Sequence, residues 1–310
     1  MLARIAAIGF NTYREAVRAR VLHGLFGLAL ATGAYALVVG AFAVRDTLRV
    51  VSDLGAASIS VYGIVVAVVL SATSLYRELE LKTIFPILAR PILRGEYLLG
   101  KYAGIVLTLF VFVAADAGAL LLALASLGGR PPALVLGVGA GSVAAALLVA
   151  WRAKAWRTYV PIVWALVLAV AGFWLARVAP DDQRVVAGAA LLTLLEVCVV
   201  AGVATLFAAF SSPFLTAVFT FGVFIVGRSA DTLANLPHRV FGQAIHEIGR
   251  ALSWVVPNLM VYVPPRSLLT GEAANVAFWP YAVMAALQAV AWSAGLLALA
   301  ALIFRRRDFS

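Results

Sequence analysis

Long apolar segments with almost no charge recur along the chain and constrain its fold more than any other feature. A helix of about 20 apolar residues crosses a bilayer with every backbone polar group bonded internally. Segments of this kind occur at 21 to 44, 56 to 75, 102 to 127, 133 to 150, 158 to 176, 185 to 210, 213 to 229 and 276 to 304. The sequence therefore predicts an all-α, polytopic integral membrane helix bundle with about 8 transmembrane helices.

The composition excludes most soluble classes of protein. Charged residues make up 12% of the 310 residues and hydrophobic residues 64%, against about 25% charged residues in soluble domains. The net charge of +10 therefore raises the question of which membrane side carries it, and we expect no nucleic-acid partner. Cys198 has no partner thiol, and the histidines are too scattered for a metal set, so we expect no cofactor or metal in this chain.

The distribution of basic residues predicts the topology, because Lys and Arg concentrate in cytosolic loops. With a cytosolic amino terminus, the turn WRAKAWR (151 to 157) and the basic end at 305 to 307 are cytosolic too. Asp181 and Asp182 then face outward. Both termini are predicted to be cytoplasmic.

Three segments flank or interrupt the spans. Residues 1 to 20 are interpreted as an amphipathic interfacial helix, with an ordinary basic tail as the alternative. The segment 213 to 229 is short for a span, and a re-entrant hairpin is the alternative; as a span, it requires Arg228 to snorkel to the outer interface. Residues 230 to 275 are expected to form an extracytoplasmic amphipathic segment.

The longest charged interval between two apolar segments is LYRELELKTIFPILARPILRGEYLLGK, from Leu75 to Lys101. Apolar residues recur in it at spacings of three and four, which is typical of an amphipathic helix docked on a partner. Pro86 and Pro91 divide it, because proline ends or kinks a helix. We expect two short helices separated by a turn.

This interval resembles the cytosolic loop of type-2 ABC exporter (ABC-2) permeases, in the run E-x-E-x-K-T-I followed by L-x-x-P-I-x-R-x-E-Y-x-x-G-K. FAAFSSPFLTAVF (207 to 219) and WVVPNLMVYVPPRSLLTGE (254 to 272) are also similar to segments of that family. The resemblance implies one transmembrane permease domain over 1 to 310, with a six-helix core and an inserted transmembrane hairpin at 128 to 184. It also implies that the cytosolic segment 76 to 101 is the coupling segment, contacting an ATPase through Arg77, Glu78, Glu80, Lys82, Thr83, Arg90, Pro91, Arg94 and Glu96.

The same resemblance implies the function. The chain is expected to be the permease subunit of an ABC exporter in a bacterial-type inner (plasma) membrane, similar to the nitrous-oxide-reductase maturation permeases. Its expected partners are two copies of a cytosolic ABC ATPase subunit, which would hold ATP and Mg, a second permease copy forming a homodimer, and the lipid bilayer. The chain is not expected to be an enzyme, because GEYLLGKY (95 to 102) has Tyr102 where a phosphate loop needs Ser or Thr.

Besides a non-transporting membrane scaffold, two alternatives stay open. One is force transmission to an extracytoplasmic protein partner through the segment 230 to 275. The other is an ion-coupled secondary carrier that uses Glu196 and Asp116, acidic residues inside spans, as polar lining of the translocation path. Either carboxyl group can instead fix helix packing. The glycines of GVGAG (137 to 141) are interpreted as a small-residue face that lets two helices approach closely.

Overall fold

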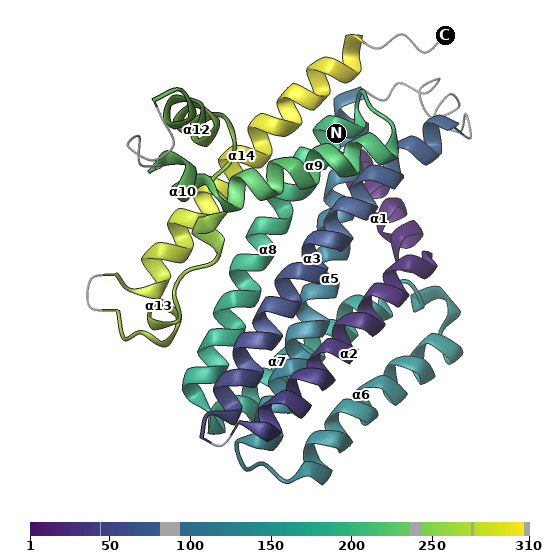
Figure 1. Cartoon of the computed structure of the whole chain (residues 1–310). Helices are drawn as coiled ribbons and strands as arrows, with labels where there is room; N and C mark the ends of the chain where they lie inside the picture. Colours follow the sequence, from purple (N-terminus) through teal and green to yellow (C-terminus); the bar gives the residue numbers. More distant parts are fainter. Residues whose placement is uncertain (44, 81–93, 236–242, 274–275, 307–310) are drawn as a thin grey trace.

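The computed structural model describes residues 1–310 except 44, 81–93, 236–242, 274–275 and 307–310, and the side chains of 75–80, 94, 245, 305 and 306 are also left undescribed. These residues form a bundle of α-helices (Figure 1), and the described part contains no β-strand. Seven helices are long and apolar enough to cross a membrane. The all-α polytopic bundle predicted from the sequence is therefore confirmed.

The apolar helices in chain order are α2 (Arg20–Phe42), α3 (Thr47–Glu80), α5 (Arg94–Leu127), α6 (Pro132–Arg152), α7 (Val160–Leu175), α8 (Pro180–Ala208), α9 (Pro213–Arg228) and α14 (Phe278–Arg306). The remaining described helices are α1 (Leu2–Arg18), α10 (Ala230–Ala234), α12 (Gln243–Val255) and α13 (Arg266–Thr270), with 3-10 turns η1 (Lys154–Trp156), η2 (Ala176–Val178) and η3 (Met260–Tyr262).

Proline and glycine set several helix boundaries. Gly129 lies in the turn after α5 with a φ of 103°, a backbone conformation that residues with a Cβ atom rarely adopt. Pro132, Pro180 and Pro213 each start a helix, where the missing backbone donor costs nothing. The Ser212 hydroxyl also accepts a hydrogen bond from the Leu215 backbone amide and caps α9.

The central helices are α5 and α8, and α6 is peripheral. The buried share of the apolar window is 72% in α5 and 6% in α6. Figure 1 shows α6 at the edge of the bundle. Its partner α7 is held to α5 at Gly118, where a Cβ atom would lie 2.7 Å from the backbone nitrogen of Ala169. Helix α7 is therefore part of the core, whereas α6 contributes few buried side chains to it.

Several segments that are far apart in the sequence lie at the same end of the bundle. The amino terminus, the end of α14, the end of α3 and the start of α5 lie at the same end in Figure 1. The turn between α6 and α7 is at this end as well, because Arg14 of α1 donates to the Thr158 hydroxyl at 3.3 Å. Phe10 also stacks on Tyr159, with ring centroids 4.7 Å apart. Residues expected on one side of the membrane thus lie together.

Helix α9 is shorter than most of the other apolar helices; α7 also has 16 residues, but η2 extends that segment to Val178. Its 16 residues extend about 24 Å, against a hydrocarbon core of about 30 Å. In Figure 1 it lies obliquely to α3 and α8, near the end that holds both termini. The segment expected as the seventh span is therefore helical, but it falls short of a full crossing.

Helix α1 packs along the start of α5. Gly9, Thr12, Tyr13 and Ala16 form its buried face. Burial raises the pKa of Tyr13 to about 12. A Cβ atom at Gly104 of α5 would overlap the backbone oxygen of Gly9, so the two backbones are in contact. The position of α1 at a membrane interface stays a prediction.

The expectation for GVGAG is wrong for contacts within the chain. Nothing among the described residues lies within 4 Å of a Cβ atom built at Gly137 or Gly141, and at Gly139 only Leu122 is near, at 3.7 Å. The glycines that allow close approach instead include Gly9, Gly104 and Gly118. A glycine pattern indicates where a helix can be approached, and the neighbouring helices decide which site is used.

We expect Gly104→Ala to lower the stability of the protein by about 1–3 kcal/mol, because the new methyl group overpacks the contact with α1. The matched control is Gly137→Ala, also in a helix but with open space around it, which should be neutral or stabilising by about 0.5–1 kcal/mol. Thermal unfolding of the purified protein in detergent measures both. Equal melting temperatures for the two variants would contradict the tight contact.

Candidate functional site

A groove runs between α3, α8, α9 and the segment that follows α12. Its volume is about 380 Å³, within the range of small-molecule sites, about 300–1,000 Å³. Most of its lining is apolar, and the polar lining residues are Asp53, Ser60, Thr193, Arg228 and Arg266. Two of these residues are arginines, and each belongs to a separate arginine–carboxylate contact.

The first contact, here called the inner arginine centre, joins Arg228, Glu196 and Ser60. The Arg228 guanidinium donates to the two Glu196 carboxylate oxygens, with N–O distances of 2.7 and 2.8 Å. It also donates to the Ser60 hydroxyl at 2.8 Å. Paired hydrogen bonds between a guanidinium and a carboxylate are among the strongest in proteins. The centre therefore fixes α9 to α8 and α3 at one point.

The inner arginine centre lies deep in the bundle. Glu196 is about 24 Å along α8 from Pro180 and about 18 Å from Ala208. Its side chain is fully buried, whereas that of Arg228 is 24% exposed to the groove. The expectation that Arg228 snorkels to the outer interface is therefore wrong. A buried carboxylate needs a cation nearby, and α9 ends where it supplies one.

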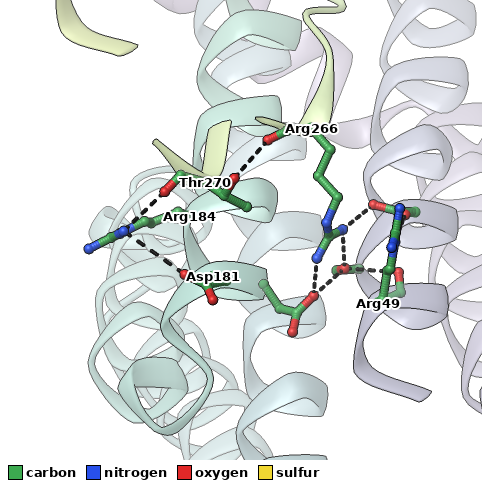
Figure 2. A network of polar contacts seen from close by, with 8 residues as sticks. Arg49, Asp181, Arg184, Arg266 and Thr270 are labelled. Atoms are coloured by element: carbon green, nitrogen blue, oxygen red, sulfur yellow. Dashed lines mark hydrogen bonds and ion pairs between the residues drawn. The ribbon is translucent and has the colours of Figure 1, made fainter. Parts of the chain in front are cut away.

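The second contact, the outer arginine centre, joins Arg266 to the starts of α3 and α8. Figure 2 shows Arg266 between the two helices, with Arg49 on one side and Asp181, Arg184 and Thr270 on the other. Arg266 donates to Asp182 at 2.5 Å and to the Ser52 hydroxyl at 3.1 Å, and it also contacts Asp53. Ser52 in turn donates to Asp182 at 2.7 Å.

Charge balance explains why this centre is stable. Burial lowers the pKa of Arg266, but the hydrogen bond to Asp182 and the charge of Asp53 outweigh that effect and leave the pKa raised. Arg49, 3.8 Å from Asp53, offsets the second carboxylate. The centre closes the outer end of the groove with α13.

Helix α3 takes part in both centres. Ser52 and Ser60 lie about two turns apart on it. The first hydroxyl contacts Arg266 and the second contacts Arg228. A movement of α3 along its own axis must therefore disturb both centres together.

The two carboxylates predicted to line the translocation path have different surroundings. Glu196 is paired behind the wall of the groove. Asp116 is buried in α5 and is not among the groove's lining residues. Its Oδ2 atom has no hydrogen-bond partner within the part of the chain that the structure describes. The structure does not bring the two carboxylates together in one site.

The predicted coupling residues are only partly described. Lys82, Thr83, Arg90 and Pro91 lie outside the described residues. Arg77, Glu78 and Glu80 lie in the last turns of α3, and Arg94 and Glu96 in the first turn of α5. The charged flanks are thus continuous with the long helices and not separate short ones, because no proline interrupts them before Pro86 or after Pro91.

Glu96 is buried, although it was predicted to lie on a surface that contacts the ATPase. Its side chain is 5% exposed and lies 3.8 Å from Arg4 of α1. Lys101, at the end of GEYLLGK, is buried and donates to the Ser74 backbone oxygen at 3.2 Å. Residues 95 to 101 are helical, unlike a phosphate loop. The contact of Glu96 with an ATPase stays a prediction.

Sequence reasoning missed Ser52, Asp53, Ser60 and Arg266 as members of the site. Serines in an apolar segment carry no signal of a partner, and Arg266 lies in the segment 230 to 275, outside the predicted spans. The available signal was the acidic residue inside a span, because a carboxylate in hydrocarbon needs a polar or charged partner at its own depth.

The comparison with protein families identifies the chain. A family model described as ABC-2 family transporter protein matches residues 11–309. The chain belongs to the ABC-2 transporter family. This confirms the resemblance stated from the coupling segment, whereas the similarity to nitrous-oxide-reductase maturation permeases stays a prediction. No curated protein matches the sequence. The groove and its arginine centres are therefore features of a membrane-spanning permease subunit of an ABC transporter.

We expect Glu196→Leu or Arg228→Met alone to destabilise this ABC-2 permease by roughly 3–5 kcal/mol, because each leaves an unpaired buried charge. The double variant should recover most of that loss, because it removes both charges. Thermal unfolding measured as a double-mutant cycle tests the coupling.

The control is Asp116→Asn, which changes another buried carboxylate of a spanning helix, one that pairs with no arginine among the described residues, and should cost less than about 1 kcal/mol. Additive losses in the double variant, or an equal loss in the control, would argue against a structural ion pair.

Proposed function

We propose that this permease subunit works in an exporter in which ATP-driven closure of two ATPase subunits moves the coupling segment 76 to 101. The family implies an ATPase partner subunit and embedding in the membrane. ATP and Mg would bind in that partner. The permease itself would convert the movement into a change of access at the groove, through packed elements with two arrangements.

The observation that carries this proposal is the length of the two helices flanking the coupling segment. Helices α3 and α5 each have 34 residues, so each extends about 51 Å, beyond the hydrocarbon core of about 30 Å. Helix α3 begins beside the outer arginine centre, contacts the inner one through Ser60 and ends in the coupling segment. A push on its cytosolic end would reach both centres without crossing a loop.

A second permease copy would complete the pathway. Val61 of α3 and Ile225 of α9, on helices that border the groove, are 57% and 61% exposed. In a homodimer these apolar faces would meet their counterparts, and the groove would lie between two helix cores. The inner membrane of a bacterial cell, with both termini cytoplasmic, is the location that fits this arrangement.

Force transmission to an extracytoplasmic partner is the second candidate function. Helix α12 is amphipathic, with Ile248, Leu252 and Trp254 exposed. The chain that follows α12 returns to α9, where the Leu259 amide donates to the Gly227 oxygen at 3.0 Å. A partner bound to α12 would therefore be linked to the inner arginine centre. The extracytoplasmic position of this segment stays a prediction from the sequence, because Figure 1 draws α12 beside α9, towards the end that holds both termini.

The ion-coupled carrier is less well supported. Its main residue, Glu196, has both carboxylate oxygens bonded to Arg228. A proton or ion site would need at least one oxygen free in part of the cycle.

We expect Glu80→Lys and Arg94→Glu to abolish association with the ATPase subunit while the isolated permease stays folded. Removing one member of a desolvated ion pair at an interface costs roughly 2–5 kcal/mol, whereas a surface charge contributes about 0–1 kcal/mol to stability. Co-purification with the ATPase and thermal unfolding of the permease alone measure the two effects. The permease alone should show no ATP hydrolysis.

The control reversal is Arg184→Glu at the other end of the bundle, where the side chain is 61% exposed. It should leave ATPase association intact. Normal association in both coupling-segment reversals would remove this segment from the interface, and unfolding of the lone permease would make it part of the bundle.

The proposed topology predicts that cysteines at Lys154 and Asp181 react from opposite membrane sides in a Cys198→Ala background. Asp181 is preferable to Asp182 because its side chain is 64% exposed, against 13% for Asp182. Labelling with a membrane-impermeant thiol reagent, in cells and in inverted vesicles, measures the sides. Reaction of both cysteines from one side would refute the topology.

A further inference from the structure

A basic and aromatic surface forms where α1 meets the turn between α6 and α7. We define it by Arg14, Arg18, Lys154, Arg157, Trp156 and Tyr159, all of which are exposed. Helix α1 and the turn are joined by the hydrogen bond from Arg14 to Thr158 and by the stack of Phe10 on Tyr159. Trp156 also contacts Tyr159, with the two rings tilted by 57° and their centroids 5.8 Å apart.

The cations of this surface are not neutralised within the described part of the chain. None of its four basic side chains forms an ion pair with a described residue. A hollow of about 490 Å³ lies beside Arg14 and Arg18, and its one acidic lining residue is Glu15. Arg14 and Arg18 line this hollow, and Lys154 and Arg157 lie on the adjoining turn, so the surface as a whole is positively charged and favours an anionic ligand.

The surroundings favour a lipid over a soluble anion. Tryptophan and tyrosine concentrate where a membrane meets water. Below the turn, the apolar residues Leu147 and Leu148 of α6 and Val163 of α7 are exposed, so the same region offers a path for acyl chains. Clusters of Lys and Arg next to spanning helices attract anionic headgroups, about 1 kcal/mol for each cation.

We propose that this surface binds the phosphate headgroup of an anionic phospholipid, whose acyl chains lie along α6 and α7. The bound headgroup bridges α1 and the α6–α7 turn, which otherwise touch through few polar contacts. The lipid therefore serves as an integral link between α1 and the turn that joins α6 to α7. The inference needs only that the chain is embedded in a membrane, and it holds whatever the transport direction.

The test counts lipids bound to the full chain purified in mild detergent, by native mass spectrometry. Phosphatidylglycerol and phosphatidylcholine with identical acyl chains are added in separate titrations. We expect phosphatidylglycerol to be retained preferentially. Arg14→Gln with Arg18→Gln, and separately Lys154→Gln with Arg157→Gln, should each weaken that retention roughly 30-fold, the effect of two cations.

The matched control is Arg177→Gln, which changes an exposed arginine at the other end of α7, where it stacks on Trp174 at 4.0 Å. It should leave retention unchanged. The Lys154→Gln with Arg157→Gln variant and the Arg177→Gln control change exposed side chains and should keep the melting temperature of the unaltered protein, measured in parallel without lipid. Arg14→Gln also removes the hydrogen bond to Thr158, so the lipid retention of the α1 double variant is compared at a temperature where it is fully folded. Equal retention of the two lipids, or unchanged retention in both double variants, would overturn the proposal.

Two further measurements distinguish a lipid from other ligands of this surface. Glycerol 1-phosphate at the lipid's concentration should not compete, because it lacks acyl chains; competition would assign the surface to a soluble anion and overturn the lipid site. The ATPase subunit should still associate with the double variants. Loss of that association with unchanged lipid retention would assign the surface to a protein partner instead.

Discussion

The buried carboxylate of Glu196 is the constraint on which much of this structure depends. An isolated charge in an apolar interior is too costly to keep, so a cation must reach the middle of α8. Arg228 does so, and α9 therefore ends at that depth. The segments that follow are held close to this end of α9. Asn258 donates to Asp231, just after α9, and Gln288 of α14 donates to the Asn258 oxygen. One ion pair thus sets where α9 stops and where the chain returns to α14.

The outer arginine centre adds a second fixed point on the same helix. Arg266 holds α13 to the starts of α3 and α8, while Arg228 holds α9 further along. The groove between these points is lined by apolar side chains, which tolerate sliding better than directional hydrogen bonds do. Sliding of α3 must therefore break and remake polar contacts at two places, which favours discrete arrangements over a continuum.

The sequence predicted the helices better than the contacts between them. Composition and length identify spanning segments because every residue contributes to the same signal. Partner choice depends on single atoms: Gly104 is used and Gly137 is not, although both lie in apolar helices. Likewise, the acidic residue in α8 was visible in the sequence, but its pairing with Arg228 depends on how far α9 reaches, and Ser60 gives no sign of its role.

The shortness of α9 bears on how the chain enters the membrane during synthesis. Helix α8 emerges first and carries Glu196, and α9 follows after the short turn at 209 to 212 with an arginine at its far end. A lone charged residue at a helix centre raises the insertion free energy by about 2.5–3.5 kcal/mol on translocon-based scales. Entry of the two helices together, as a hairpin, lets Arg228 pair with Glu196 and so lowers the insertion cost of the acidic helix. Biogenesis of this region is therefore a two-helix event, in which the acid on the first helix provides the binding site for the base that ends the second.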